Sequence, residues 1–372
     1  MIINNLVDNK LLIISLQKFG GGAIDTLGLS NGLCANKFFH YLIISQDNEL
    51  ADRFTDNEYR KVFKIKTFKS SLLDFLVQTF IFFRFSKLLK ILYQIKPKVV
   101  LTTHFHPWLI FIFFSRFFLK YKIFYAVHDN PFDPKEEGPP FATFLEGIFV
   151  KYSDIVITYS KFIREDIKKY LSNKKIETVY LGSYKELFPD FRKSPEINKE
   201  SLTILFFGRI LPYKGIDVLI KALEILQEKG LKIETIIAGR GELDKESLEK
   251  IKRLGIEFKN EWTSNDELLS LLEKSDVLIL PYKKGTQSGV ISLGLAYGIP
   301  IIATKVGSFG EFIEDGFNGF LVKPNDPNDL AQKLEKIYFD REILLEMNDN
   351  ALKFGEKFSW ANTTKELIKL LN

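Results

Sequence analysis

Arg209 and Lys214 are the residues of this chain whose types and spacing best suit the binding of a polyanion. They lie in the segment Phe207-Gly-Arg-Ile-Leu-Pro-Tyr-Lys-Gly-Ile-Asp217, between an apolar run that predicts a strand and a stretch that predicts a helix. An arginine can bind a phosphate through two hydrogen bonds, and a lysine adds a mobile point charge. We therefore expect both side chains to converge on one ligand. Two solvated surface cations are the alternative.

The stretch that follows the apolar run Val277–Leu280 suggests a second anion site. That run is short enough to be a buried strand of a parallel sheet. A turn containing Gln287 and Ser288 follows it, and we expect a helix to begin at about Gly289. The first backbone N–H groups of such a helix, at Gly289 and Val290, are left free to bind a phosphate. An ordinary loop without a ligand is the alternative.

Two more glycine turns follow predicted strands in the second half. Gly208 comes directly before Arg209 and lets the backbone turn, and Gly239 lies in the segment Ala238-Gly-Arg-Gly-Glu242. The second turn is no dinucleotide-binding fingerprint, because Asp244 stands where the third glycine is expected.

Polar residues also follow predicted strands in the first half. His104, His106, His128 and Asp129 all lie just past the end of such a strand, and Gly20–Gly22 predicts a turn after another. Ligands of parallel sheets bind outside the carboxyl ends of the strands. These residues are therefore candidates for a site, with hydrogen-bonded structural histidines as the alternative.

Apolar runs and amphipathic stretches alternate along the chain, which predicts parallel sheets covered by helices on both faces. The length of 372 residues suits two domains. The proline- and charge-rich segment Leu187–Glu200 predicts a linker, so we place an N-terminal domain at 1–190, a C-terminal domain at 191–358 and a last helix at 359–372. The expected strands are Leu11–Leu16, Tyr41–Ser45, Val62–Thr67, Val99–Thr103, Ile123–Val127, Ile155–Tyr159, Leu202–Phe207, Ile233–Ala238, Gly255–Phe258, Val277–Leu280, Pro300–Thr304 and Gly319–Val322.

Composition excludes several kinds of site. The single cysteine, Cys34, allows no intrachain disulfide, and the histidines lack the spacing of a zinc motif. The net charge of +5 is dispersed and no nucleic-acid-binding module is recognisable, so we expect no nucleic-acid partner. The first residues show no basic start followed by a small-residue cleavage site, and we expect a cytoplasmic protein.

The 35 phenylalanines crowd the first half of the chain. Residues 75–95 and 108–124 are rich in aromatic residues with Lys and Arg between them. Neither segment reaches the roughly 20 uninterrupted apolar residues needed to span a bilayer. One interpretation is a pair of buried helices. The other is a face that rests on an anionic membrane through aromatic and basic side chains.

The motifs of the second half, taken in order, resemble those of the nucleotide-sugar-dependent retaining glycosyltransferases of sequence family four. The series is G-R-x-x-x-x-K-G, G-x-G-E, S-D-V-x-x-x-P and G-x-P-I-I-A-T-x-V-G, followed by a glutamate and by D-G-x-N-G-x-L-V. It covers roughly Leu202 to Trp360. In the first half the resemblance is thinner and includes the glycine loop Gly20–Gly22 and the pair His128-Asp129.

This resemblance implies the α/β fold called GT-B, in which two Rossmann-like doubly wound domains face each other across a cleft and the last helix crosses back to the first domain. Members move a sugar from a UDP- or GDP-sugar to an acceptor, with retention at the anomeric carbon and without a metal or other cofactor. For this chain we expect a glycan or lipid-linked acceptor in bacterial cell-surface polysaccharide synthesis. The place of action would be the cytoplasm or the inner face of the cell membrane.

The resemblance also implies roles for single residues. Arg209 and Lys214 would neutralise the leaving diphosphate, while His128 would lie against the donor sugar and Asp129 would orient its loop. His104 and His106 are candidates for the acceptor side, with a structural role as the alternative. The donor-binding residues implied are Gly21, Gly22, Gly208, Gly239, Trp262 near the nucleobase (or in the core), Gln287, Ser288, Gly289, Val290 and Glu311 (or a helix N-terminal acid).

The sequence departs from the family pattern at one place. The family commonly carries two glutamates eight positions apart for the hydroxyls of the donor sugar and the ribose, and those positions are Gly285 and Leu293 here. Neither side chain can accept a hydrogen bond. We hypothesise that Gln287 and Ser288 take over part of the contact with the sugar or phosphate.

Two other functions remain open because of this departure. One is a non-catalytic nucleotide-sugar-binding subunit, and the other is a sugar-nucleotide epimerase of the same fold. The presence of Arg209, Lys214 and His128 argues against the non-catalytic subunit.

Overall fold

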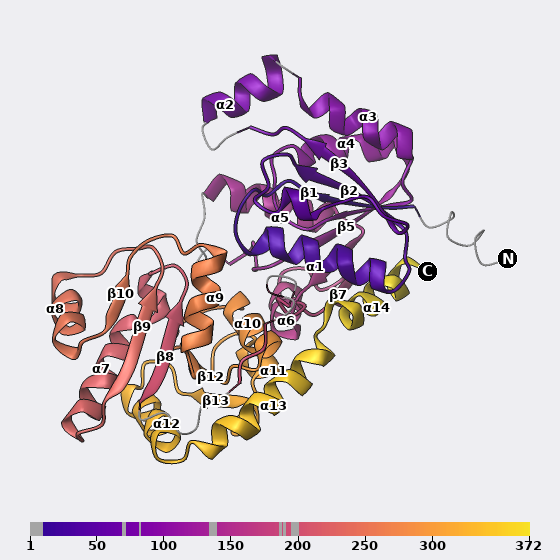
Figure 1. Ribbon diagram of the computed structural model, residues 1–372. Helices are drawn as coiled ribbons and strands as arrows, with labels where there is room; N and C mark the ends of the chain where they lie inside the picture. The colour runs from indigo at the N-terminus through magenta and orange to yellow at the C-terminus, as the bar shows by residue number, and fades with distance from the viewer. Residues whose placement is uncertain are drawn as a thin grey trace. The chain divides into compact units, whose positions relative to one another are not determined.

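The computed structural model describes residues 10–68, 72–81, 83–133, 140–185, 188, 191–194 and 201–372. The chain forms two units, Met1–Gly182 with Phe358–Asn372, and Ser183–Lys357 (Figure 1). The first unit thus ends at Gly182, ahead of the residue 190 that we expected, and most of the expected linker Leu187–Glu200 lies outside the described residues.

The first unit contains a parallel sheet in the order β3-β2-β1-β4-β5-β6-β7. The strand order reverses between β1 and β4, so the carboxyl ends of these neighbours lead to opposite sides of the sheet. The short strand β7, with the sequence Ile-Glu-Thr, carries no apolar run that would predict it. The strands are β1 Leu11–Ser15, β2 His40–Ser45, β3 Arg60–Ile65, β4 Val99–Thr102, β5 Lys122–Val127, β6 Ile155–Thr158 and β7 Ile176–Thr178.

Helices cover both faces of this sheet (Figure 1). Alternate residues of β1 point to opposite faces, so Leu11 and Ile13 pack with α1 and α14, whereas Leu12 and Ile14 pack with α3, α4 and α6. The helices are α1 Gly21–Ala35, the 3-10 turn η2 Ala51–Arg53, α2 Leu72–Leu76, the π-helix η3 Val77–Ile81, α3 Phe85–Ile95, α4 Leu109–Leu119, α5 Pro140–Tyr152, α6 Lys161–Lys168 and α14 Trp360–Leu371.

The expectation that all of Gly20–Gly22 forms a turn is corrected. Only Gly20 has a positive φ, of 81°, while Gly21 and Gly22 are the first residues of α1. The turn is therefore a single residue, because one glycine in this conformation is enough to bring the chain from β1 into the helix.

The two aromatic segments do not form the pair of buried helices that one interpretation expected. Residues 75–95 are divided among α2, η3 and α3, and 108–124 among α4, a turn and β5. On α4, Phe117 and Phe118 are 74% and 73% exposed. The interpretation that both segments are buried is therefore wrong for α4.

The second unit has a parallel sheet in the order β10-β9-β8-β11-β12-β13, which reverses between β8 and β11. The apolar runs predicted these strands, with β10 shifted by two residues at its start. The strands are β8 Leu202–Phe207, β9 Ile233–Ala238, β10 Glu257–Lys259, β11 Val277–Leu280, β12 Ile301–Thr304 and β13 Gly319–Val322. The helices are the 3-10 turn η4 Pro212–Lys214, α7 Ile216–Glu228, α8 Lys245–Leu254, α9 Asn265–Lys274, α10 Gly289–Tyr297, α11 Phe309–Phe312, α12 Pro327–Phe339 and α13 Glu342–Lys357.

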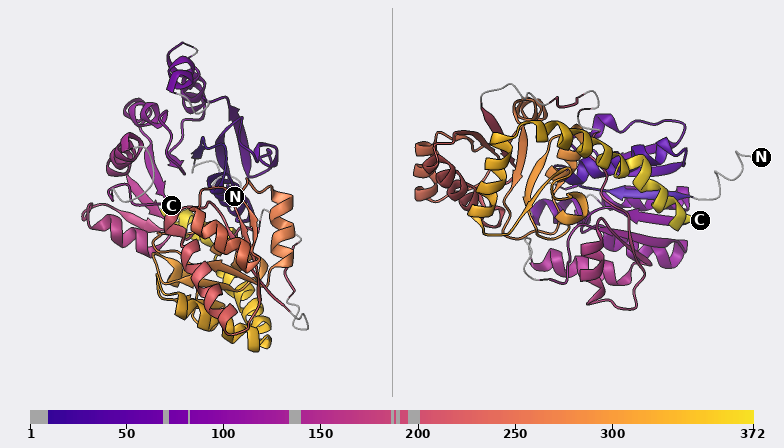
Figure 2. Two further views of the ribbon diagram at one scale, coloured as in Figure 1. Left: turned by 90° about the vertical axis from the view of Figure 1, so that its left-hand side faces the viewer. Right: turned by 90° about the horizontal axis from the view of Figure 1, so that it is seen from below.

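The last helix, α14, belongs to the first unit and packs on α1 (Figures 1 and 2). Buried Trp360 lies so close to α1 that a Cβ atom on Gly28 would be 1.9 Å from its Nε1 atom. The side chain of Asn36 donates to the backbone oxygen of Ala361 at 2.7 Å. The absence of a side chain at Gly28 therefore leaves the space that the ring of Trp360 occupies.

Candidate functional site

The candidate site of the second unit begins with two glycine loops, after β8 and β9. The N–H of Gly208 donates to the oxygen of Ala238 at 3.0 Å. Gly208 and Gly239 have φ values of 129° and 146°, and a Cβ atom on Gly239 would lie 1.9 Å from the oxygen of Gly208. No larger residue fits at Gly239 without a backbone shift. The two loops therefore run in contact beside the point where the strand order reverses.

Tyr282 lies at the centre of this region, directly after β11. Its ring is buried, and the Nζ atom of Lys214 stands 3.8 Å from the ring centroid, within range of a cation–π interaction. Its hydroxyl shares a hydrogen bond of 3.2 Å with the Oγ atom of Ser288. Tyr282 thus connects the loop that carries Lys214 with the start of α10.

Burial also raises the pKa of Tyr282, an effect that its hydrogen bond with Ser288 and the nearby charge of Arg209 oppose. The hydroxyl therefore stays protonated at neutral pH, and the side chain can donate a hydrogen bond. Arg209 itself is exposed on the loop after β8. The sequence analysis missed Tyr282, although an aromatic residue directly after a predicted buried strand was a signal for it.

Helix α10 begins at Gly289 as predicted, with Ser288 as its N-cap residue. The N–H of Val290 points to the Oγ atom of Ser288 at 3.4 Å, and the N–H of Ile291 donates to the oxygen of Ser288 at 3.1 Å. The expectation that the Val290 N–H is free is therefore corrected. The bond to Ser288 is longer than a typical N–H···O hydrogen bond, so an anion could compete for this donor.

The loop before α10 is held by the loop after β12. The oxygen of Thr286 accepts hydrogen bonds from both the backbone N–H and the hydroxyl of Ser308, each of 2.8 Å. Glu311 follows in the first turn of α11, and Gln287 is half-buried on the first loop. Leu293, one of the two positions where the family has glutamate, is buried on α10.

Trp262 is 65% exposed in the loop after β10, so the alternative of a core residue is wrong. This loop adjoins the loop that carries Gly239: the Gly239 N–H donates to the oxygen of Lys259, and the Gly241 N–H donates to the side chain of Asn260, both at 3.0 Å. An exposed indole beside a glycine turn is available to stack on a planar ring.

The candidate site of the first unit is a cluster of Asp25 on α1 with His104 and His128, which follow β4 and β5. The two imidazole rings stack with centroids 4.4 Å apart, and the Oδ2 atom of Asp25 lies 3.8 Å from the Nδ1 atom of His128. A Cβ atom on Gly22 would lie 2.4 Å from the Nε2 atom of His104. Asp129 is exposed next to His128. The sequence analysis missed Asp25, an acid within the otherwise apolar first turns of α1.

Burial keeps both histidines of this cluster neutral. It lowers the pKa of His128 to about 4, against the opposing effects of Asp129 and of a hydrogen bond to the Thr103 backbone, and it lowers the pKa of His104 well below its usual value. One ligand atom from each of Asp25, His104 and His128 lies within 4.8 Å of the others. Two neutral imidazoles and a carboxylate are also a donor set that transition metals accept. Independence from metal thus stays a prediction.

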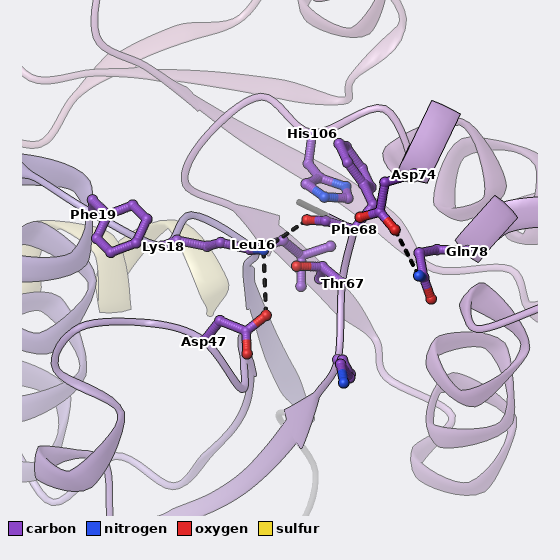
Figure 3. A pocket seen from close by; sticks show the side chains of 10 residues that line it. Leu16, Lys18, Phe19, Asp47, Thr67, Phe68, Asp74, Gln78 and His106 are labelled. Carbon is purple, nitrogen blue, oxygen red and sulfur yellow. Dashed lines mark hydrogen bonds and ion pairs between the residues drawn. The ribbon is translucent and has the colours of Figure 1, made fainter. Parts of the chain in front are cut away.

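His106 does not join this cluster but lines a separate pocket of about 1030 Å³ in the same unit (Figure 3). The side chains around it come from the carboxyl ends of β1 to β4 and from α2 and η3, segments that the sequence analysis did not combine. They are Leu16, Lys18, Phe19, Asp47, Lys66, Thr67, Phe68, Asp74, Gln78 and His106.

Comparison with protein families gives two matches that together cover most of the chain. Residues 19–183 match the family described as Glycosyltransferase Family 4, and residues 187–354 match the family described as Glycosyl transferases group 1. The division between the two matches falls close to the boundary between the two units at Gly182.

Two curated relatives align with this chain over about three fifths of their own length. The chain is 32% identical to the uncharacterized glycosyltransferase MJ1178 of Methanocaldococcus jannaschii over 225 residues, which are 57% of this chain and 58% of the relative. It is 28% identical over 224 residues to an uncharacterized 41.2 kDa protein in the cps region of Klebsiella pneumoniae, with 58% of this chain and 61% of that protein covered.

Among solved structures, Anabaena HepE in complex with UDP and glucose is similar, with a TM-score of 0.72 and 18% sequence identity. The match covers 97% of this chain and 99% of that one. Together with the two sheets described above, this likeness confirms the GT-B fold with its two Rossmann-like domains.

Burial of the histidines makes the stability of the fold depend on pH. Besides the pKa values of His104 and His128, it lowers the pKa of His40 to about 4 and that of His106 to about 3. The unfolded chain binds these protons near pH 6.5. Between about pH 4 and 6.5, each such histidine therefore lowers the unfolding free energy by up to about 1.4 kcal/mol for each pH unit of acidification. Glu146 opposes them, because burial raises its pKa to about 7.

We predict that the melting temperature of the protein falls as the pH is lowered from 7 to 5. Over this range the four histidines with lowered pKa values reduce the unfolding free energy, whereas the carboxyls of Glu146 and Glu49, whose pKa values burial raises, increase it. Scanning calorimetry at constant ionic strength measures the effect. A melting temperature that is constant or rises on acidification would contradict the neutral, buried state of the histidines.

Proposed function

The chain belongs to the glycosyl transferases group 1 family, and we propose that it is a retaining glycosyltransferase that moves a sugar from a UDP- or GDP-sugar to a glycan or lipid-linked acceptor. The observation that carries this proposal is the arrangement around Tyr282. There Lys214, the nearby Arg209 and the start of α10 meet at the reversal of the strand order in the second unit.

This arrangement suits a nucleoside diphosphate. Two cationic side chains and the positive end of a helix supply positive charge, and the glycine backbones at Gly208 and Gly239 allow a ligand to approach closely. When the bond to the sugar breaks, negative charge grows on the diphosphate. Groups that are already in place stabilise it without having to reorganise.

For the sugar itself we propose a contact with His128. Because its imidazole is neutral, it offers one hydrogen-bond donor and one acceptor rather than a fixed positive charge. Asp25, at 3.8 Å from Nδ1, would hold the orientation of the ring. In the proposed transfer, the bond between the anomeric carbon and the diphosphate oxygen breaks, and the same carbon bonds to the hydroxyl oxygen of the acceptor. The hydroxyl proton passes to the departing diphosphate, whose growing negative charge Lys214 and Arg209 would stabilise.

Two of the similar proteins support the proposed donor nucleotide and the proposed role in polysaccharide synthesis. HepE was solved with UDP and glucose, which favours a UDP-sugar as the donor and UDP as the nucleotide that is released. The relative from Klebsiella is described as lying in a cps region, which favours a role in bacterial polysaccharide synthesis in the cytoplasm or at the membrane. A non-catalytic subunit or an epimerase are the alternatives, and both predict that no sugar reaches an acceptor.

We predict that the purified protein releases UDP from UDP-glucose or a related donor and that Lys214→Ala lowers this rate at least about a hundredfold, as expected for loss of a charge aimed at a leaving group. His128→Ala should lower the rate as well, while a binding subunit would bind UDP without releasing it from a donor. Coupled detection of UDP measures the rate.

The matched control is Lys221→Ala, which removes an exposed lysine of α7 in the same unit. Its rate should equal that of the parent protein. Equal rates for Lys214→Ala and Lys221→Ala in folded proteins would overturn the role of Lys214.

We predict a graded effect at Tyr282. Tyr282→Phe loses only the hydrogen bond to Ser288 and should weaken UDP binding a few-fold, whereas Tyr282→Leu also loses the ring beneath Lys214 and should weaken it about tenfold. Titration calorimetry with UDP measures both. Both Tyr282→Phe and Ser288→Ala break the hydrogen bond between these side chains, so the effect of the double variant should be smaller than the sum of the two single effects. Additive effects, or an equal loss in the Phe and Leu variants, would contradict this account.

We also propose that the first unit rests on an anionic membrane. Helices α3 and α4 pack together through stacked Phe85 and Phe111, with ring centroids 3.9 Å apart, and lie side by side in Figure 1. Between residues 75 and 122 the sequence holds eight Lys or Arg and no Asp or Glu. Among the described residues of this region, the exposed large apolar side chains are Leu76, Phe80, Phe83, Tyr93, Ile110, Phe114, Phe117 and Phe118. Arg116 is paired with Asp154 at 3.2 Å. Aromatic rings combined with an excess of basic residues suit anionic lipid headgroups. None of the described helices is long and apolar enough to cross a bilayer.

We predict that the double variant Phe117→Ser and Phe118→Ser binds vesicles containing phosphatidylglycerol at least about fivefold more weakly than the parent, because two exposed rings no longer insert. Co-sedimentation at low salt measures binding. The control is Phe339→Ser, which removes a ring 71% exposed in the second unit. No binding by the parent, or equal binding to vesicles of phosphatidylcholine alone, would overturn the proposal.

A further inference from the structure

The segment that follows Gly182 packs along α10 inside the second unit. The N–H of Tyr184 donates to the oxygen of Ser292 at 3.4 Å, and the hydroxyl of Tyr297 donates to the oxygen of Tyr184 at 2.6 Å. The N–H of Phe188 donates in turn to the hydroxyl of Tyr297 at 3.0 Å. The backbone around Tyr184 is therefore attached to the helix whose first turn belongs to the proposed diphosphate site.

The same segment is attached again at the last turn of α10. The ring of Phe191 lies with its centroid 5.2 Å from that of Tyr297, and the N–H of Lys193 donates to the backbone oxygen of Tyr297 at 3.0 Å. The side chain of Asn348 donates to the oxygen of Lys193 at 3.0 Å, and the buried ammonium group of Lys193 donates to the oxygen of Glu273 at 2.5 Å. These contacts fix the segment on α10, so Tyr184 is held in place by the protein itself.

The side chain of Tyr184 lies against the first residue of α10. It is buried, and a Cβ atom on Gly289 would lie 2.7 Å from its Oη atom and 2.8 Å from its Cε2 atom. A larger residue at this position would have to displace the phenol, so glycine allows its close approach to the helix backbone. The Oη atom thus lies beside the end of α10 where the helix dipole is positive and the N–H groups point outward.

A second tyrosine meets the same turn from another segment, and its hydroxyl has a different task. The hydroxyl of Tyr282 shares its hydrogen bond with the Oγ atom of Ser288, and the Nζ atom of Lys214 stands over its ring. Tyr282 therefore acts on a ligand through Ser288 and Lys214. The hydroxyl of Tyr184 lies next to Gly289, one residue further along the chain.

We propose that the hydroxyl of Tyr184 donates a hydrogen bond to the diphosphate of the nucleotide, beside the N–H groups at the start of α10. Phosphate oxygens form strong, charge-assisted hydrogen bonds with O–H donors. A donor that is already fixed in place stabilises the charge of the leaving diphosphate without having to reorganise. The inference rests on the proposed function, because it adds a residue to the donor site of that reaction.

The test compares Tyr184→Phe, which removes the hydroxyl and keeps the ring, with the parent chain. The probes are UDP and GDP together with their nucleosides, uridine and guanosine, which lack the phosphates. For the diphosphate that the parent binds more tightly, we expect at least about tenfold weaker binding, as for a lost hydrogen bond to a charged group. Binding of the matching nucleoside should not change. Titration calorimetry measures the diphosphates, and saturation-transfer NMR measures the nucleosides.

The matched control is Tyr338→Phe, the same change at a half-buried tyrosine of α12 in the second unit. It should bind the diphosphates and the nucleosides as the parent does. A variant in which Tyr184 were only a packing residue would distort the turn as a whole, and diphosphate and nucleoside would then be weakened by the same factor.

Release of the nucleoside diphosphate from a donor, measured on the same samples, separates this inference from the proposed function. If the parent releases it but Tyr184→Phe binds it as the parent does, or loses the nucleoside by an equal factor, the role of Tyr184 is wrong and the proposed function stands. If Tyr184→Phe weakens only the diphosphate and the parent releases none from a donor, the proposed function fails while Tyr184 remains a diphosphate ligand. Binding of neither UDP nor GDP by the parent would overturn both.

Discussion

The reversal of strand order within each sheet is the constraint on which the candidate sites depend. Two neighbouring strands whose connections leave to opposite sides cannot both be covered by the helices that follow them, so the carboxyl ends at that point stay open. In the second unit the open ends are those of β8 and β11, which carry Lys214 and Tyr282. In the first unit they are those of β1 and β4, which carry the pocket and His104.

Tyr282 joins two parts of the proposed diphosphate site in the second unit, where Gly285 and Leu293 stand at the positions of two glutamates common in the family. The buried ring lies under Lys214, and the hydroxyl bonds to Ser288, so the cation and the start of α10 are positioned by one rigid side chain. At one of the two positions where the family has glutamate, the buried side chain of Leu293 on α10 adds to the hydrophobic core instead. In the proposed function, the affinity for a diphosphate would come from cations and helix N–H groups, with fewer hydrogen bonds to ribose and sugar hydroxyls than two glutamates would supply.

The sequence predicted the strands and the start of α10 well, because short apolar runs and a Ser-Gly turn are local signals. It could not predict contacts that join distant segments. Asp25 of α1 meets His128, which follows β5, only because both elements belong to one layered unit. Likewise the pocket combines side chains from six segments, none of which predicts a pocket alone. The exposure of Phe117 and Phe118 was also hidden, since an aromatic helix looks the same in sequence whether its outer face is covered or open.

The two units differ in the kind of charge they offer, and this difference suits the two halves of a transfer reaction. The second unit presents Arg209 and Lys214 beside a helix start, which favours a polyanion. The first unit presents histidines held neutral by burial and a pocket whose lysines and aspartates balance. Because the charges of this pocket balance, it offers a polyanion no net attraction, whereas the cations of the second unit do. In the proposed function, electrostatics would therefore favour the second unit for the nucleotide diphosphate.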